Sequence, residues 1–353
     1  MSVRCPSRRG VDGMTSSVVE PVVQDHGRPA DGCAGASDIA GVLILAGCAV
    51  WALIAAMGRP ARPEGVLLAV LAVAAGYACG RMAGSLLPVA SAAAAGLAGF
   101  GLACASPYGL TGHEGAGAGQ LTLATGAVCC AAWAAPRALR PALWLLATAI
   151  TLTAVVAGST AGSVASGAVL VCSLTAARRR HRLPALAACV LIAAVAVAGT
   201  WAVAKDAVPG GLPPALRAQL TEHRIRLWQD AARIEETDPL RGAGPDRFGE
   251  LSPAAAQPQN PEAKPHSAPL QQAAGQGLPG VVLLGAAFGW MLHALWRSPR
   301  PTPVVLTAAA TLTALAVMSC LGNALSCSQI TAGAGLLAGL ATARLNDDPG
   351  AVP

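Results

Sequence analysis

Ten apolar runs, separated by short polar segments, follow one another along this 353-residue chain. Most are close to the roughly 20 residues that an α-helix needs to cross the hydrocarbon core of a bilayer. Helices suit that environment because all their backbone hydrogen bonds are internal. We therefore predict an all-α fold, a polytopic transmembrane bundle of about ten spans. The predicted spans are 39–57, 65–80, 86–105, 119–135, 142–158, 161–177, 184–204, 276–296, 303–322 and 328–343.

The composition agrees with a membrane protein. Only 12% of the residues are charged and 54% are hydrophobic, whereas a soluble domain carries roughly 25% charged residues. This balance excludes an ordinary cytosolic enzyme and a disordered chain. The 24 Lys and Arg exceed the 18 Asp and Glu only modestly, which does not suggest nucleic-acid binding.

Arginines predict the orientation of the bundle, since cytoplasmic loops are enriched in them. Four connections carry them on one side of the predicted bundle, at Arg81, at Arg137 and Arg140, at Arg178–Arg182, and at Arg297 and Arg300. Arg59 and Arg62 fall on the other side and count against this assignment. The prediction is a plasma-membrane protein with both termini in the cytoplasm. Its parts are a disordered tail (1–38), about seven spans (39–204), an extracytoplasmic loop (205–275), about three spans (276–343) and a second tail (344–353).

The distribution of acidic residues indicates where an active site could lie. No predicted span contains one, and nine of the 18 lie between residues 205 and 265. Ion-coupled transporters usually place charged side chains within their spans. We therefore expect the active site in the 205–275 loop.

The loop begins with a predicted amphipathic helix, residues 213–237, in which Arg224 and Trp228 share one face. A helix that lies on the membrane surface has the same pattern and remains an alternative. The turn DPLRGAGPDRF follows, where Gly242 and Gly244 require a tight, irregular backbone. It lacks the lysine of a phosphate-binding loop.

The loop ends at His266 and Ser267, which precede a short helix with Pro269 in its first turn. Gly277 and Gly280 mark a break before the next membrane helix. A lone histidine in such a place is most often a polar surface residue, but a position between a basic helix and the membrane favours a function.

These motifs resemble the O-antigen ligase/polymerase family of membrane glycosyltransferases. The resemblance rests on His266-Ser267 followed by Gly277-x-x-Gly280, on RIRLWQDA, and on the Pro-Leu-x-Gly-x-Gly turn. It covers residues 205–285 well. Three positions depart from the family pattern: Thr160 stands where an Arg is frequent, Pro269 where an aromatic residue is usual, and Gly275 where a Glu is common.

The resemblance implies transfer of a glycan from an undecaprenyl-diphosphate carrier to an acceptor hydroxyl of a glycan or lipid-linked sugar. Arg224 then binds the diphosphate, for which a guanidinium is suited, and His266 acts as the base for the acceptor. Further substrate contacts are assigned to Arg226, Trp228, Arg247 and Ser267. Gly242, Gly244, Gly277 and Gly280 are structural. No metal and no cofactor are expected.

Two other functions remain open from the sequence. One is a multi-span transporter or permease, and the other is a degenerate, non-catalytic protein that binds a glycan lipid, which the changes at Thr160 and Gly275 would suit. Most of the 11 cysteines read as buried, inert residues. Cys320 and Cys327 flank a turn predicted outside the membrane, where a disulfide can persist.

Overall fold

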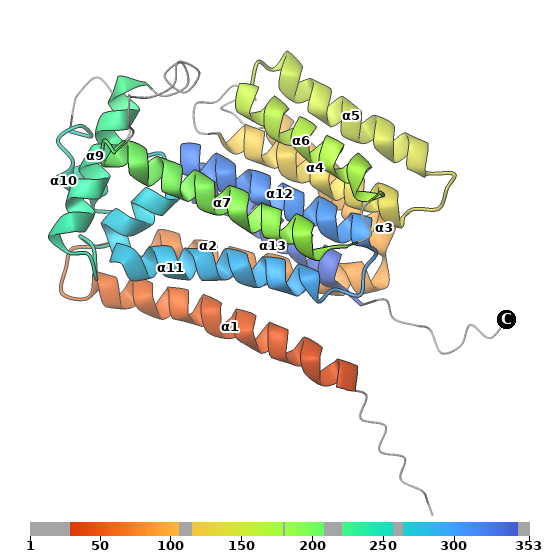
Figure 1. Cartoon of the computed structure of the whole chain (residues 1–353), viewed down its shortest axis with the longest axis horizontal. Helices are drawn as coiled ribbons and strands as arrows, with labels where there is room; N and C mark the ends of the chain where they lie inside the picture. Colours follow the sequence, from red (N-terminus) through yellow and green to blue (C-terminus); the bar gives the residue numbers. More distant parts are fainter. Residues whose placement is uncertain (1–28, 106–114, 179–180, 208–220, 257–263, 345–353) are drawn as a thin grey trace, which may run out of the picture.

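The computed structural model describes residues 29–105, 115–178, 181–207, 221–256 and 264–344. Within these ranges the regular structure is entirely helical, which confirms the predicted fold class (Figure 1). The elements are α1 (Pro29–Ala56), α2 (Glu64–Leu86), α3 (Pro88–Ala105), α4 (Ala116–Ala134), α5 (Arg140–Val156), α6 (Thr160–Ala176), α7 (Leu183–Ala204), α9 (Glu222–Thr237), α10 (Phe248–Leu251), α11 (Ala268–Trp296), α12 (Thr302–Leu321), the 3-10 turn η1 (Ala324–Ser326) and α13 (Ser328–Thr342).

Each of the ten predicted apolar runs lies on its own helix. Six of these helices are long and apolar enough to span a membrane, namely α1, α2, α3, α7, α11 and α12. The shorter apolar helices α5 and α6 fall below that length, so the count of about ten spans is not confirmed. α1 begins at Pro29, and residues 29–38, which we expected in the disordered tail, are helical. Residues 1–28 of that tail lie outside the described residues.

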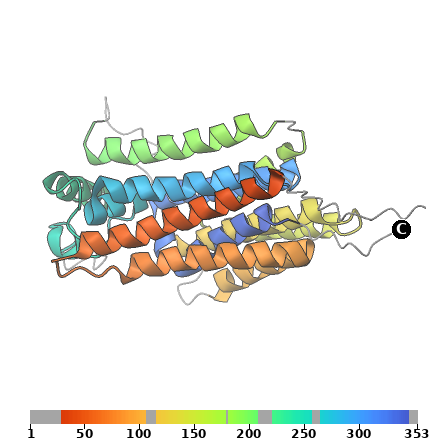
Figure 2. The ribbon, with the colours of Figure 1, turned by 90° about the horizontal axis from the view of Figure 1, so that it is seen from below.

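The helices run back and forth, so their connections gather at two ends of the bundle (Figures 1 and 2). We call the end that holds α9 and α10 the loop end, and the opposite one the arginine end. At the arginine end, Arg182 donates to the Ser298 carbonyl at 2.8 Å and to Thr302 Oγ1 at 3.1 Å. Arg300 donates to the carbonyls of Ala343 (2.8 Å) and Gly84 (2.6 Å). Arginines therefore satisfy helix-terminal carbonyls at this end, as cations near helix C-termini do.

The core lies around α4 and α12, both of which are buried along most of their length. Peripheral helices expose large apolar side chains, such as Leu71, Val156 and Val195, as helices that face lipid do. Hydroxyl groups link neighbouring helices inside the bundle: Ser173 Oγ accepts from the Trp133 indole at 3.0 Å and lies 2.8 Å from Thr307 Oγ1. Such bonds between helices are a common source of cohesion in membranes.

Small residues allow α2 and α13 to approach closely. Gly76 and Gly80 on α2 face the α13 backbone, and Gly335 and Gly339 on α13 face the α2 backbone. A Cβ at Gly80 would lie 2.2 Å from the Leu336 carbonyl oxygen. Glycines at this spacing let two membrane helices pack backbone against backbone.

We predict that Gly80→Ala destabilises the protein by about 1–3 kcal/mol, the usual cost of overpacking, although alanine is the better helix former. The measurement is thermal unfolding of the purified protein in detergent. Gly167→Ala on α6 is the matched control, because a Cβ there has no neighbour within 4 Å. Equal unfolding temperatures for the two variants would contradict the close approach of α2 and α13.

Candidate functional site

The polar segment between α7 and α11 forms the loop end, with α9 and α10 beside the first turns of α11 (Figure 1). α9 packs against α7 and α11 and buries Leu227 and Trp228. Thr221 caps it by accepting from the Arg224 amide at 3.4 Å. The predicted helix therefore exists over 222–237, with its apolar face against the bundle. Residues 213–220 lie outside the described residues.

Trp228 supports the backbone that leads into His266. Its buried indole donates to the Pro265 carbonyl at 2.8 Å. His266 is itself buried and adopts a left-handed conformation with φ 51°. Holding a non-glycine residue in this left-handed backbone conformation typically costs of order 1–3 kcal/mol, and such residues cluster at functional sites.

Ser267 is the N-cap residue of α11, but its side chain makes no capping hydrogen bond. A serine in this position normally accepts from an amide in the first turn. Here the Ser267 carbonyl accepts from the Gln271 amide at 2.8 Å. The buried Ser267 hydroxyl has no hydrogen-bond partner among the described residues. A buried hydroxyl of this kind needs an explanation, such as a bound water, an ion or a catalytic function.

α11 starts at Ala268 with Pro269 in its first turn, and it breaks at Gly277, where φ is 68° and ψ is −169°. Both features were predicted. The DPLRGAG turn packs against this break through three backbone hydrogen bonds. They run from Ala243 N to Ala274 O (2.8 Å), from Gly244 N to Gly275 O (3.0 Å) and from Leu278 N to Pro239 O (2.8 Å).

Two glycines permit this contact. A Cβ at Gly242 would lie 2.7 Å from the Ala274 carbonyl oxygen, and one at Gly277 would lie 2.5 Å from the Pro239 carbonyl oxygen. Both have positive φ, 61° and 68°, which glycine adopts without strain. The two glycine motifs, separated in sequence, therefore form one packed unit.

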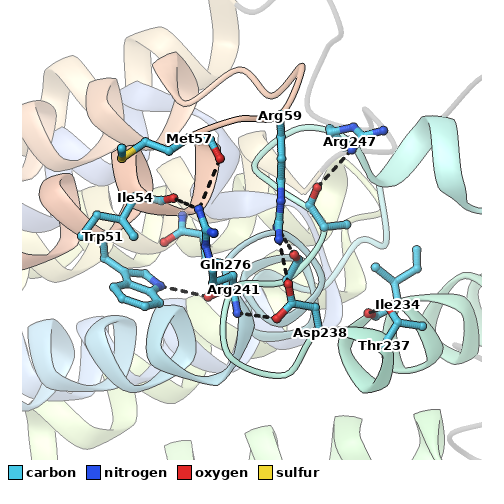
Figure 3. A network of polar contacts seen from close by, with 12 residues as sticks. Trp51, Ile54, Met57, Arg59, Ile234, Thr237, Asp238, Arg241, Arg247 and Gln276 are labelled. Carbon is cyan, nitrogen blue, oxygen red and sulfur yellow. Dashed lines mark hydrogen bonds and ion pairs between the residues drawn. The ribbon is translucent and has the colours of Figure 1, made fainter.

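The sequence analysis missed three side chains that hold this unit to α1 (Figure 3). Arg59, after α1, forms an ion pair with Asp238 at 2.7 Å and also donates to the Gly242 carbonyl. Arg241 donates to the Ile54 carbonyl at 2.7 Å, and Trp51 donates to the Gln276 carbonyl at 2.9 Å. The Arg59 guanidinium, with a bond from the Arg241 amide, lowers the pKa of Asp238 below 3.8.

A partly open cavity of about 1060 Å³ lies between α1, α2, α7, α11 and α12. Its walls are mainly apolar, and its polar lining gathers near the loop end. The polar and charged lining residues include Arg62, Glu64, Asp246, Lys264, Gln271, Gln272 and Gln276. Lys264 and Ala268, which also line it, flank the His266-Ser267 pair in sequence.

The remaining predicted site residues occupy different surroundings. Arg224 donates to the Leu321 carbonyl at 3.2 Å. Cys320, which precedes Leu321 in the chain, lines the cavity. Arg226 is mostly exposed and lies 3.8 Å from Glu222. Arg247 lies 3.4 Å from Glu250. The structure therefore places Arg224 against the end of α12, although it is not among the lining residues of the cavity, and leaves Arg226 exposed on α9.

Thr160, at the place of the family arginine, is the exposed first residue of α6. Cys320 is a free thiol, so the possible disulfide between Cys320 and Cys327 is not formed in this structure. Among the described residues, no three His, Cys, Asp or Glu side chains are grouped so that they could hold a metal ion.

The fold and this site define a multi-pass helical membrane protein with a polar segment at one end of a lipid-facing bundle. Residues 143–285 match the family model described as O-antigen ligase. The match covers 143 of the 353 residues and supports the resemblance of this region to the O-antigen ligase family. The match contains every residue that the sequence analysis assigned to the site. No match to a curated protein or to a solved structure was found.

We predict that Gly277→Ala separates the turn from the break, since the new Cβ meets the Pro239 carbonyl at 2.5 Å and the backbone conformation there disfavours alanine. Limited proteolysis between residues 238 and 268 should become faster by a factor of about ten, the effect of a loss near 1.4 kcal/mol. Gly285→Ala, where a Cβ meets nothing within 4 Å, should match the wild type. Unchanged cleavage of Gly277→Ala would exclude this packing.

The lowered pKa of Asp238 gives a pH prediction. Between its folded pKa and 3.8, the unfolded chain binds more protons at this carboxyl than the folded protein does. The contribution of Asp238 is thus complete above about pH 5 and declines as the pH falls through the folded pKa. Unfolding temperatures measured from about pH 7 down to about pH 3 should fall more steeply for the wild type than for Asp238→Asn. Parallel curves would show that the pair does not form.

Proposed function

We propose that the chain transfers a glycan from an undecaprenyl-diphosphate carrier to an acceptor hydroxyl on the extracytoplasmic side, with residues 205–275 as the catalytic segment. The observation that carries this proposal is the cavity. Its apolar walls lie between membrane helices, and its polar end is lined by Lys264, Ala268 and Pro269, the sequence neighbours of the buried His266-Ser267 pair. An amphiphile with a long isoprenoid chain and a polar head matches this distribution.

Cations at the polar end support a diphosphate there. Among the described residues, Arg62 and Lys264 line the cavity, and no hydrogen bond or ion pair is found for either side chain. Glu64 and Asp246 also line it, so the mouth carries both signs of charge. Arg224 donates to the carbonyl of Leu321, the residue after Cys320, which lines the cavity. We assign the leaving diphosphate to Arg224, with Arg62 and Lys264 as additional cations, because fixed cations stabilise the charge that develops as it departs.

In the proposed reaction, the acceptor oxygen forms a bond to the anomeric carbon while the bond from that carbon to the diphosphate oxygen breaks. The proton of the acceptor hydroxyl passes to His266, and undecaprenyl diphosphate leaves. The left-handed backbone at His266 and the support of Pro265 by Trp228 fix the ring's attachment point. The uncapped Ser267 hydroxyl is available to orient the histidine or the sugar. Arg226 and Arg247 are proposed to contact the glycan outside the cavity.

Most of the arginines in short connections favour the proposed sidedness, whereas Arg59 and Arg62 count against it. Arg140, Arg182 and Arg300 lie at the arginine end, as cytoplasmic arginines do, and the catalytic segment lies at the opposite end.

We predict that His266→Ala, at matched protein level, lowers transfer about 10²–10⁴-fold, the usual contribution of a general base. The measurement is the size of the surface glycan together with the undecaprenyl-linked pool. Full-length lipid-linked chains would accumulate if the enzyme is a ligase, and short precursors if it is a polymerase. Arg224→Gln should give the same product pattern.

His181→Ala is the control, because His181 is exposed at the arginine end. An unchanged glycan profile in both His266→Ala and Arg224→Gln would refute catalysis at this site and leave a binding or transport function.

A further inference from the structure

We propose that Arg59 is a positioning residue for the transfer reaction. With Arg241 and Trp51, it holds the break in α11 in the place that donor binding requires. This inference rests on the proposed function but concerns residues outside the matched family region, since Arg59 and Trp51 precede residue 143.

The contacts of Arg59 bridge Asp238 and Gly242, the first and fifth residues of the DPLRGAG turn. One guanidinium nitrogen lies 2.7 Å from Asp238 Oδ2, and the other donates to the Gly242 carbonyl. The Gly242 amide in turn donates to the Asp238 carbonyl at 2.8 Å. A planar guanidinium can bind two acceptors in a fixed relation, so Arg59 sets the shape of the turn as well as its position.

A second arginine makes the reciprocal contact. Arg241, from within the turn, donates to the carbonyls of Ile54 (2.7 Å) and Met57 (3.2 Å) at the end of α1. Those carbonyls lie where an α-helix has no intrahelical donors left. Each element therefore supplies an arginine to the other, and Figure 3 shows both arginines converging between α1 and the turn.

The turn passes this constraint to α11. Through its bonds to Ala274 and Gly275 it sets the last residues before the break, and Trp51 holds the carbonyl of Gln276 directly. Gly275 and Gln276 both line the cavity. A Cβ at Gly280 would lie 2.5 Å from Gln276 Cβ, so the second glycine of the motif leaves room for the Gln276 side chain.

α1 also forms a wall of the cavity, through Leu45 and Cys48. The contacts of Arg59, Arg241 and Trp51 thus join α1, a wall of the cavity, to α11, the helix that begins just after His266.

The experiment compares Arg59→Gln and Arg59→Lys with Arg233→Gln. Arg233 also forms an Arg–Asp pair, 3.2 Å from Asp230, but is 68% exposed against 22% for Arg59. Initial rates of glycan transfer are measured against donor concentration in detergent-purified protein. Binding of undecaprenyl diphosphate is measured separately by native mass spectrometry.

We expect Arg59→Gln to lower kcat/KM for the donor about 10- to 100-fold, as a small misplacement of a site does, and to weaken undecaprenyl diphosphate binding. Arg59→Lys, which can keep the pair with Asp238 but not both bonds, should give an intermediate loss. Arg233→Gln should stay within about twofold of the wild type.

The inference is overturned if Arg59→Gln lowers only the unfolding temperature and keeps wild-type kinetics and binding below that temperature. It is also overturned if Arg59→Lys retains the full wild-type values. Should Arg59→Gln not fold, Asp238→Asn tests the same pair from the other side. Loss of transfer in His266→Ala with normal kinetics in Arg59→Gln would refute this inference alone. Normal transfer in His266→Ala with weakened lipid binding in Arg59→Gln would refute only the assigned catalysis.

Discussion

A helix that stops and restarts at the edge of a membrane leaves carbonyl and amide groups without intrahelical partners, and the site depends on how α11 satisfies them. Unpaired backbone groups are costly away from water. At the break, the carbonyls of Ala274 and Gly275 accept from the turn, and the carbonyl of Gln276 accepts from Trp51. The amide of Leu278, on the far side of the break, donates to Pro239. The break is therefore fully dependent on chain segments that lie far from it in sequence.

This dependence explains what the sequence could and could not predict. The apolar runs, the start of α11 at Ala268 and the break at Gly277 are local features, and periodicity, proline and glycine indicate them directly. The contacts of Trp51 with Gln276 and of Arg59 with Asp238 join residues separated by 225 and 179 positions. No local pattern records such a pairing. Arg59 was therefore considered only as a charge that contradicts the predicted orientation, although its main contacts are with the loop.

The glycine content of the chain is explained in part by close contacts between backbones. Where α2 meets α13, glycines bring two backbones into contact, and at the turn Gly242 and Gly277 do so again. Lipid supplies little hydrophobic force between helices, so close van der Waals contact has to hold them together. Several of the 40 glycines of the chain are, at these positions, the means by which the bundle and the site reach their shape.

Arginines satisfy helix-terminal carbonyls at both ends of the bundle. At the arginine end, Arg182 and Arg300 do so for neighbouring helices, and at the loop end Arg241 does so for the last turn of α1. Arg59, at the loop end, also pairs with a carboxylate, Asp238, which belongs to the segment that carries the glycine turn. An arginine that opposes the charge rule for cytoplasmic loops and is paired across the fold indicates a fixed internal contact. In this chain, Arg59 lies where the polar segment is attached to the bundle.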